Sequence, residues 1–515
     1  MQIKKENYRH WDMGAAALLF IFFLTRIHNL LALPIFLDEA SHITRAQYVW
    51  QDKPLYLLST GKVLAPYLMA IFWPFQGPVF LGRFVVILLG LIGIAACYAI
   101  GRELYSRQAG LLAMVLWIVC PQLLFLERMA LVDTTISSMA MLALWIAIRM
   151  IRSGRKRTAI LCGVGLTLCV LAKTTGIVFL PIPVLVALLI KSPVNWKNRV
   201  LLVGIAYATV FMLLLAPVLY IRQTGDDPTG LKYGLTTTNT DKLGTRLQAN
   251  ATKALNAEQV YFSIPMLWVM IIGAAAATLY VPRVTLLLLP LVGALLLAII
   301  ATAVSLWLRY ISPAAPFLLL LTAIGLIALA DALRESYRIR LVTLLPWAVA
   351  AVWAIVIGIP FLLTAYRDPS KLPLPAGDRT EYIEWIPSGY GLQPAVDYLQ
   401  QIIKQPTTVI VTAVNCDGAR MYVPYDSPVK LVCPGVDWGG GNYSIISDIQ
   451  QRVNTEGQVY VLGEDAPIVA EYELPAPLTV LGRFPRPNGL YAVKLYQIRR
   501  AGNLATTPNT SVDEP

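Results

Sequence analysis

Long apolar runs separated by short polar or basic turns fill the first 363 residues of the chain. An apolar run of about 17–22 residues is long enough to cross the ~30 Å hydrocarbon core of a bilayer as a helix. We therefore expect residues 1–363 to form a polytopic α-helical membrane domain with eleven spans. The expected spans are Met13–Leu33, Val79–Ile100, Ala109–Leu126, Leu131–Ile148, two within Thr158–Ile190, Val200–Tyr220, Val260–Tyr280, Thr285–Leu306, Ile311–Ala330 and Leu341–Leu363.

One run, Thr158–Ile190, is too long for a single crossing and carries the polar sequence Lys173-Thr-Thr-Gly176 near its middle. A lysine and a glycine inside an apolar run indicate a turn. We therefore predict that the chain crosses twice here, with Lys173 at the turn. The polar stretch 221–259 is expected to be a loop on the same side of the membrane as Lys173.

Basic residues between the spans predict the orientation of the chain. Lysine and arginine accumulate on the cytoplasmic side of membrane proteins. Lys4, Lys5 and Arg9 precede the first span, and the clusters 149–157 and 334–340 follow later ones. The N-terminus is thus expected in the cytoplasm, and it lacks the small-residue cleavage site of a secretory signal. An odd number of crossings then places the C-terminal part outside.

The pattern changes after residue 363. Short alternating runs at Thr407–Val414 and Gln458–Leu462 indicate strands, and Pro394–Ile403 is amphipathic. Residues 364–502 therefore predict a small extracytoplasmic soluble domain of the α/β or α+β class. Its nearly continuous apolar strand favours α/β, because such strands are covered by helices on the sheet. Residues 503–515, rich in Thr, Asn and Pro, are expected to form a disordered tail.

Composition agrees with a membrane protein and excludes an ordinary soluble one. Hydrophobic residues make up 57% of the 515 residues and charged residues 14%, whereas soluble domains contain about 45–50% apolar residues. The net charge of +12 could suggest a nucleic-acid partner. The basic residues instead lie in short clusters between apolar runs, so we expect the lipid bilayer as a partner and no nucleic acid.

The six cysteines and three histidines do not predict a metal cage. Four cysteines, Cys97, Cys120, Cys162 and Cys169, lie within apolar runs and are expected to be small buried hydrophobic residues. Cys416 and Cys433 lie in the outer domain, where an oxidising compartment would permit a disulfide. The pairing stays open, and no Cys/His spacing typical of a structural zinc site occurs.

Charged residues gather at the outer ends of the expected spans. The pair Asp38-Glu39 follows the first span, and its position at a membrane boundary costs hydration, which favours a functional site over a solvated helix end. Acids and bases from several distant loops would share this membrane face, whereas simple end-capping would distribute them over both faces. The other members are Lys62, Glu127, Arg128, Asp133, Lys173 and Arg309 with Tyr310.

Several of these stretches resemble motifs of the GT-C superfamily of membrane glycosyltransferases, in the branch of protein O-mannosyltransferases and lipid A aminoarabinose transferases. The matching stretches are the Asp38-Glu39 pair, Arg128-Met-Ala-Leu-Val-Asp133, Leu171-Ala-Lys173-Thr-Thr-Gly176, and Arg309-Tyr310 followed by Pro313 and Pro316. The resemblance covers about Met13–Ala330. It departs from the family at Lys173, where the order is Lys-Thr-Thr-Gly and many relatives have Thr-Lys-Gly.

The resemblance implies an inverting transfer of a sugar from a polyprenyl-phosphate donor to a protein, lipid or glycan acceptor on the outer face. A carboxylate must take the acceptor proton, and cations must stabilise the leaving phosphate. We expect Asp38 to be the base, with Glu39 and Asp133 as further catalytic carboxylates. Lys62, Arg128, Lys173, Arg309 and Tyr310 are expected to bind substrate, with Lys62 and Arg309 assigned to the phosphate.

Some alternatives remain open at this stage. Paired carboxylates bind hard cations, so a divalent ion between Asp38 and Asp133 is neither required nor excluded. A lipid-linked glycan ligase or polymerase would look similar and would transfer a chain in place of one sugar. A transporter would show repeated halves and acids near mid-membrane, which the sequence does not show.

Overall fold

The structure is a computed structural model that describes residues 9–51, 54–224, 243–304, 306–412, 415–433, 443–464 and 478–500. The chain divides into two compact units. The first comprises Met1–Leu33 and His42–Arg379, and the second comprises Pro34–Ser41 and Thr380–Pro515. The division thus falls later than the expected boundary at residue 364, and the segment that carries Asp38 belongs to the C-terminal unit. The expected tail, 503–515, lies outside the described residues.

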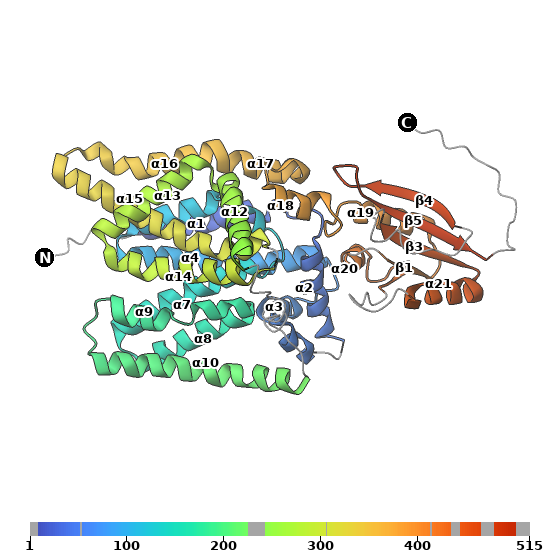
Figure 1. The fold of residues 1–515 in the computed structure, drawn as a ribbon, viewed down its shortest axis with the longest axis horizontal. Helices are drawn as coiled ribbons and strands as arrows, with labels where there is room; N and C mark the ends of the chain where they lie inside the picture. The colour runs from blue at the N-terminus through green and yellow to red at the C-terminus, as the bar shows by residue number, and fades with distance from the viewer. Residues whose placement is uncertain are drawn as a thin grey trace. The chain divides into compact units, whose positions relative to one another are not determined.

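The first unit is helical throughout its described part (Figure 1). Its α-helices, in chain order, are α1 (Arg9–Ile27), α2 (Leu37–Tyr48, whose first turn belongs to the second unit), α3 (Leu64–Ile71), α4 (Pro78–Leu104), α5 (Arg107–Val119), α6 (Pro121–Leu126), α7 (Asp133–Ser153), α8 (Lys156–Ala172), α9 (Ile182–Leu189), α10 (Trp196–Thr224), α12 (Leu243–Phe262), α13 (Ile264–Tyr280), α14 (Pro282–Thr302), α15 (Ala315–Tyr337), α16 (Leu345–Trp353), α17 (Ile359–Arg367) and α18 (Ala376–Arg379). The shorter helical turns are η1 (Pro54–Thr60), η2 (Thr174–Phe179), η4 (Leu308–Tyr310), η5 (Ser312–Ala314), η6 (Arg340–Leu344), η7 (Ala354–Gly358) and η8 (Pro369–Lys371).

Seven helical segments in the described part of the chain are long and apolar enough to cross a membrane. A bent pair, α12 with α13, raises the number to eight if it counts as one span. Two shorter apolar segments, Arg107–Val119 and Thr174–Leu189, do not reach the length of a full span. The protein is therefore a multi-pass membrane protein, as expected, but the expected count of eleven spans is not confirmed.

Local sequence explains where the apolar runs break. The expected span Ala109–Leu126 is two helices, because Cys120 is extended and Pro121 starts α6 at a position where its missing N–H costs nothing. The run 158–190 breaks at Lys173, whose backbone is extended between α8 and η2. The predicted break at Lys173 is thus present, but the two crossings predicted here are not confirmed, because Thr174–Leu189 is shorter than a full span.

Part of the expected outer loop 221–259 is helical. Residues 225–242 lie outside the described residues, but α12 begins at Leu243 and continues to Phe262. The buried residues Asn250, Ala254, Ala257 and Tyr261 recur every three or four positions, which is the period of one helix face. Between α12 and α13 the axis turns by 101°, and Figure 1 shows α12 running across the direction of α13. This helix was not predicted from the sequence.

The helices of the first unit pack through small residues. α7 packs on α4 and on α8, and α13 packs on α15. A Cβ added to Gly325 of α15 would lie 1.8 Å from the backbone oxygen of Gly273 in α13. The absence of a side chain at Gly325 therefore lets these two backbones touch, as is common where membrane helices associate.

The second unit contains a five-stranded mixed sheet in the order β2-β1-β3-β5-β4. β1 (Thr407–Val411) pairs in parallel with β2 (Val429–Val432) and with β3 (Gln458–Glu464). β5 (Ala492–Arg499) pairs antiparallel with β3 and with β4 (Leu478–Pro485). The predicted α/β character and the two predicted strands are thus present.

Helices cover both faces of this sheet, as the apolar β1 strand predicts. On one face, Val409 and Val411 pack with the amphipathic helix α19 (Leu392–Ile402). On the other face, Ile410 packs with Ile449 of α21 (Tyr443–Glu456), the helix that Figure 1 shows beside the sheet. Alternate residues of one strand therefore enter two cores.

A disulfide joins Cys416 to Cys433 within the second unit. Cys416 is the first residue of α20 (Cys416–Arg420), and Asn415 caps this helix by accepting a hydrogen bond from the Gly418 N–H at 3.0 Å. The other four cysteines are buried and free. The expectation of four buried cysteines is thus met, and the pairing that was left open is present.

Candidate active site

Five of the eight predicted site residues lie in one region of the first unit. Its centre is Asp133, whose carboxylate Oδ1 lies 2.7 Å from Lys173 Nζ and whose Oδ2 lies 4.0 Å from Arg309 Nε. The three side chains are only 4, 14 and 5% exposed, in that order. Charges this deeply buried are stable only when they are paired. Asp133 therefore serves as the counter-ion that holds two cations in place.

Tyr310 forms one wall of this cluster. Its ring lies 3.9 Å from Lys173 Nζ and 5.2 Å from the guanidinium carbon of Arg309. Cations are attracted to the face of an aromatic ring. The Arg309-Tyr310 pair lies in the short helical turn η4, which follows α14 and precedes η5. Tyr310 therefore orients both cations without adding negative charge.

Backbone hydrogen bonds place Lys62 beside Lys173. The Val63 N–H donates to the Leu171 carbonyl at 2.8 Å, and the Thr174 N–H donates to the Gly61 carbonyl at 3.0 Å. In each of the two loops the bonded residues lie on either side of the lysine, which is Lys62 in one loop and Lys173 in the other. The two lysines, far apart in sequence, thus lie on adjacent loops.

Gly176 allows the loop after Lys173 to turn tightly. A Cβ at this position would lie 2.1 Å from the carbonyl oxygen of Cys169 in the preceding helix. Any larger residue would push η2 away from α8. The glycine of the Lys-Thr-Thr-Gly motif is thus required by close packing, and this requirement explains its position three residues after the lysine.

A cavity of about 280 Å³ opens at this place. Lys62, Lys173 and Tyr310 line it together with Thr60, Thr174 and Thr175. Ammonium groups are donors that suit phosphate oxygens. Residues Ile299, Thr302 and Ala303, at the end of α14, form a less polar wall. The cavity can therefore accept a phosphate that carries an apolar chain.

The predicted base, Asp38, lies in the second unit with Glu39. Both are in the first turn of α2, where carboxylates interact favourably with the helix dipole. Glu39 is fully buried and accepts a hydrogen bond from the Phe36 N–H at 3.0 Å, as the carboxylate does in a capping box. Asp38 is partly exposed. Glu39 therefore stabilises the helix start, whereas Asp38 keeps a surface at which a substrate could bind.

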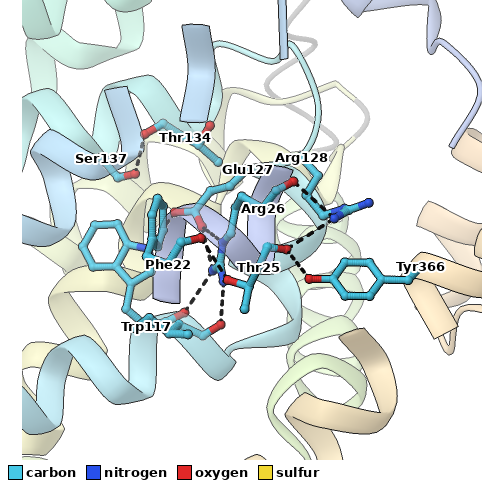
Figure 2. A network of polar contacts seen from close by, with 10 residues as sticks. Phe22, Thr25, Arg26, Trp117, Glu127, Arg128, Thr134, Ser137 and Tyr366 are labelled. Atoms are coloured by element: carbon cyan, nitrogen blue, oxygen red, sulfur yellow. Dashed lines mark hydrogen bonds and ion pairs between the residues drawn. The ribbon is translucent and has the colours of Figure 1, made fainter. Parts of the chain in front are cut away.

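Arg128 is committed to backbone groups elsewhere in the first unit (Figure 2). Its guanidinium donates to the carbonyl of Arg26 at 3.2 Å, in the last turn of α1. It also donates to the carbonyls of His28 at 2.8 Å and Asn29 at 2.9 Å, just beyond the end of this helix. The Tyr366 ring lies against it at 4.9 Å. Cations stabilise the carbonyl end of a helix. We therefore assign Arg128 to holding α1 and do not include it in the site.

A buried ion pair beside Arg128 was not predicted from the sequence. Arg26 donates to Glu127 Oε2 at 2.8 and 3.0 Å, and Trp117 Nε1 donates to Glu127 Oε1 at 2.6 Å (Figure 2). The Arg26 and Glu127 side chains are 0 and 1% exposed. Glu127 was expected only as a charge at the outer end of a span. Arg26, which lies inside an apolar run, was a signal for a buried partner.

Asp378, in α18, is a second buried carboxylate that sequence reasoning missed. It is 1% exposed and accepts a hydrogen bond from the Tyr261 hydroxyl of α12. Burial raises the pKa of Asp378 to about 6, against the opposing effects of Tyr261 and of the positive charges of Arg309 and Lys253. The electrostatic environment of Arg309 therefore includes Asp378 as well as Asp133.

The described residues contain no group of three or more His, Cys, Asp or Glu side chains that could hold a metal ion. Asp133 already has two cationic neighbours.

Comparison with known proteins agrees with this fold. The model of the dolichyl-phosphate-mannose-protein mannosyltransferase family matches residues 53–221. The structure is similar to apo ArnT from Cupriavidus metallidurans, with 12% identity, a TM-score of 0.60, and coverage of 95% of this chain and 98% of ArnT. ArnT bound to undecaprenyl phosphate gives 13% identity, a TM-score of 0.53 and the same coverage. No curated protein matches the chain in sequence.

The likeness to ArnT extends over nearly all of both chains. The chain therefore shares the overall fold of ArnT. The family match covers the segment that includes Lys62, Asp133 and Lys173.

Proposed function

We propose that this protein is an integral-membrane glycosyltransferase. It moves a sugar from a polyprenyl phosphate to a protein, lipid or glycan acceptor on the extracytoplasmic face. The observation that carries the proposal is the cavity of about 280 Å³ lined by Lys62, Lys173 and Tyr310, with Arg309 behind it. The shared fold and the family match support it, as does the bound undecaprenyl phosphate of the structurally similar ArnT.

In the proposed reaction an acceptor hydroxyl or amine attacks the anomeric carbon of the donor sugar. The bond between this carbon and the phosphate oxygen breaks, and its electron pair remains on the lipid phosphate. Lys62, Lys173 and Arg309 stabilise the charge that develops there. A single displacement inverts the anomeric configuration.

The acceptor proton goes to a carboxylate, for which we propose Asp38. Asp133 is less suited, because Lys173 and Arg309 surround it and neutralise its charge. Glu39 is also less suited, because it is buried and caps α2. Asp38 is the partly exposed member of the three.

The test is transfer by purified enzyme in lipid, with a panel of polyprenyl-phosphate sugars and membrane-extract acceptors. Asp38→Asn cannot take a proton, so transfer should fall by the ~10²–10⁴-fold typical of a lost general base. Donor binding and monodisperse elution should be unchanged. Asp426→Asn, at an exposed position of the same unit, is the matched control. Near wild-type transfer by well-folded Asp38→Asn would move the base elsewhere, with Asp133 the next candidate.

Two companion measurements define the reaction more closely. Glu39→Gln keeps an oxygen that can accept the Phe36 N–H, so we expect it to reduce transfer less than Asp38→Asn does. The mass added to the acceptor separates transfer of one sugar from transfer of a chain. Addition of a long glycan would favour the ligase or polymerase alternative.

A further inference from the structure

The segment that carries Asp38 is bound by the C-terminal unit through its backbone. Both polar backbone groups of Ile35 have side-chain partners there: the Tyr422 hydroxyl accepts from the Ile35 N–H at 2.9 Å, and Asn415 Nδ2 donates to the Ile35 carbonyl at 3.2 Å. The Leu37 N–H donates to the Pro387 carbonyl at 3.0 Å. The backbone just before Asp38 is therefore held at two alternate residues.

Close packing adds to these hydrogen bonds. Gly389 lies so near Ile35 that a Cβ on the glycine would be 2.3 Å from the Ile35 carbonyl oxygen. The rings of Phe36 and Tyr382 lie 4.6 Å apart between centroids. Ile35 and Phe36 are 0 and 3% exposed. The segment is thus buried in the C-terminal unit as one of its structural elements.

The two side chains that bind Ile35 are themselves fixed. Asn415 caps α20 through Oδ1, and the next residue, Cys416, is bonded to Cys433. The Tyr422 ring packs against the core formed by α19 and the sheet. Asn415 Nδ2 also donates to the Pro387 carbonyl at 3.3 Å, which joins both backbone stretches at one amide group. The donors and acceptors that hold Ile35 therefore occupy defined positions.

We infer that Tyr422 and Asn415 are positioning residues for Asp38, and that the C-terminal unit contributes to catalysis by fixing the backbone from which this carboxylate projects. The inference rests on the proposed role of Asp38 as the base. A base must be held within a fraction of an ångström of its working position, and a misplacement of ~1 Å can cost ~10²-fold in rate. Free rotation of Asp38 about a loose backbone would have this effect.

Two substitutions test the hydrogen bonds to Ile35 separately from the folding of the unit. Tyr422→Phe removes only the hydroxyl that accepts from Ile35. Asn415→Asp keeps an oxygen for the Gly418 N–H and replaces the donor to the Ile35 carbonyl by an acceptor. The matched controls are Tyr425→Phe at an exposed tyrosine and Asn488→Asp at an asparagine whose oxygen caps a turn.

Hydrogen exchange in lipid nanodiscs gives a readout that does not depend on activity. A lost hydrogen bond of ~1 kcal/mol corresponds to about a fivefold rise in exchange. We expect such a rise at the Ile35 and Leu37 amides in both variants and none at β1 or β3. In the transfer assay kcat should fall by ~10-fold or more with the donor KM unchanged. Both controls should behave as wild type.

Two results would overturn the inference. One is faster exchange at Ile35 with normal kcat, which would mean that the hydrogen bonds to Ile35 do not serve catalysis. The other is a lower kcat with unchanged exchange, which would mean that the residues act by another route. Each variant is informative alone, so loss of one to misfolding leaves the test intact. Failure of the proposed base is separate, because it appears as normal transfer by Asp38→Asn, and failure of the proposed function appears as no transfer by the wild-type enzyme.

Discussion

Lys173 Nζ and Asp133 Oδ1 lie 2.7 Å apart, although one residue follows the last helix of a helical hairpin and the other begins its first helix. Asp133 is the first residue of α7, and Lys173 ends α8, which packs along α7. A short connection between antiparallel helices brings the start of the first level with the end of the second. The ion pair is therefore a direct consequence of the helix lengths and of the turn at Gly154, whose φ is +67°.

This ion pair predicts that a single and a double substitution change stability by different amounts. Lys173→Met should lower thermal stability, because removing one partner of a buried pair costs about 3–5 kcal/mol. It should also weaken donor use. The double variant Asp133→Asn with Lys173→Met should regain only part of the stability, because Arg309 then loses Asp133 as a counter-ion, and it should not regain transfer. Melting curves and donor kinetics on the same preparations check both statements, and a stable Lys173→Met with normal donor KM would contradict them.

Arg309 provides a test of the phosphate side. A hydrogen bond to a charged group contributes about 1.5–3 kcal/mol, so Arg309→Ala should raise the donor KM by about 10- to 100-fold. Arg309→Lys should recover only part, because an ammonium lacks the planar fork of the guanidinium. Arg340→Ala, at an exposed arginine, is the control. Donor kinetics unchanged in Arg309→Ala would reassign Arg309 to anchoring η4.

Asp378 predicts a pH-dependent difference in stability. Its folded pKa of about 6 is above the ordinary value of 3.8, so the folded state binds more protons between these pH values. Stability contributed by this group is therefore lost as the pH rises from about 4 to 6. Asp378→Asn does not ionise and can still accept from Tyr261. The melting temperature of Asp378→Asn minus that of the wild type should be larger at pH 7.5 than at pH 5, by ~2 °C or more. An equal difference at the two pH values would refute this prediction.

The orientation of the chain can be measured with reporter fusions. Fusions after Leu126 and after Leu363 should both report the outside, because the basic clusters 149–157 and 334–340 mark the cytoplasmic side. A fusion after Arg157 is the cytoplasmic control. A cytoplasmic signal after Leu363 would place the C-terminal unit inside the cell, and Asp38 with it.

The pattern of polar and apolar residues predicted much of this architecture. The break at Lys173 was predictable, because a lysine in an apolar run has to reach water or a counter-ion. The helix α12 was missed because its many polar residues masked the spacing of Asn250, Ala254, Ala257 and Tyr261. That spacing was present in the sequence, so a count of helical periodicity could have found it.

The partners of Ile35 could not be predicted in the same way. Tyr422 and Asn415 bind its backbone, and backbone groups leave no trace in the side-chain pattern. The pairing of Asp133 with Lys173 was only partly visible, since both were expected at outer turns but nothing in the sequence specified their distance. Arg26 and Glu127 likewise needed the packing of α1 against α5.

The two backbone hydrogen bonds between the Lys62 and Lys173 loops have a consequence for evolution. Every residue except proline carries the N–H and carbonyl groups that form them. Most residues along Leu171–Thr174 and at Val63 can therefore be substituted during evolution without separating the two loops. A scaffold tied by its main chain can keep a cationic cavity in place while its sequence diverges, which is consistent with an architecture shared with ArnT at 12% identity.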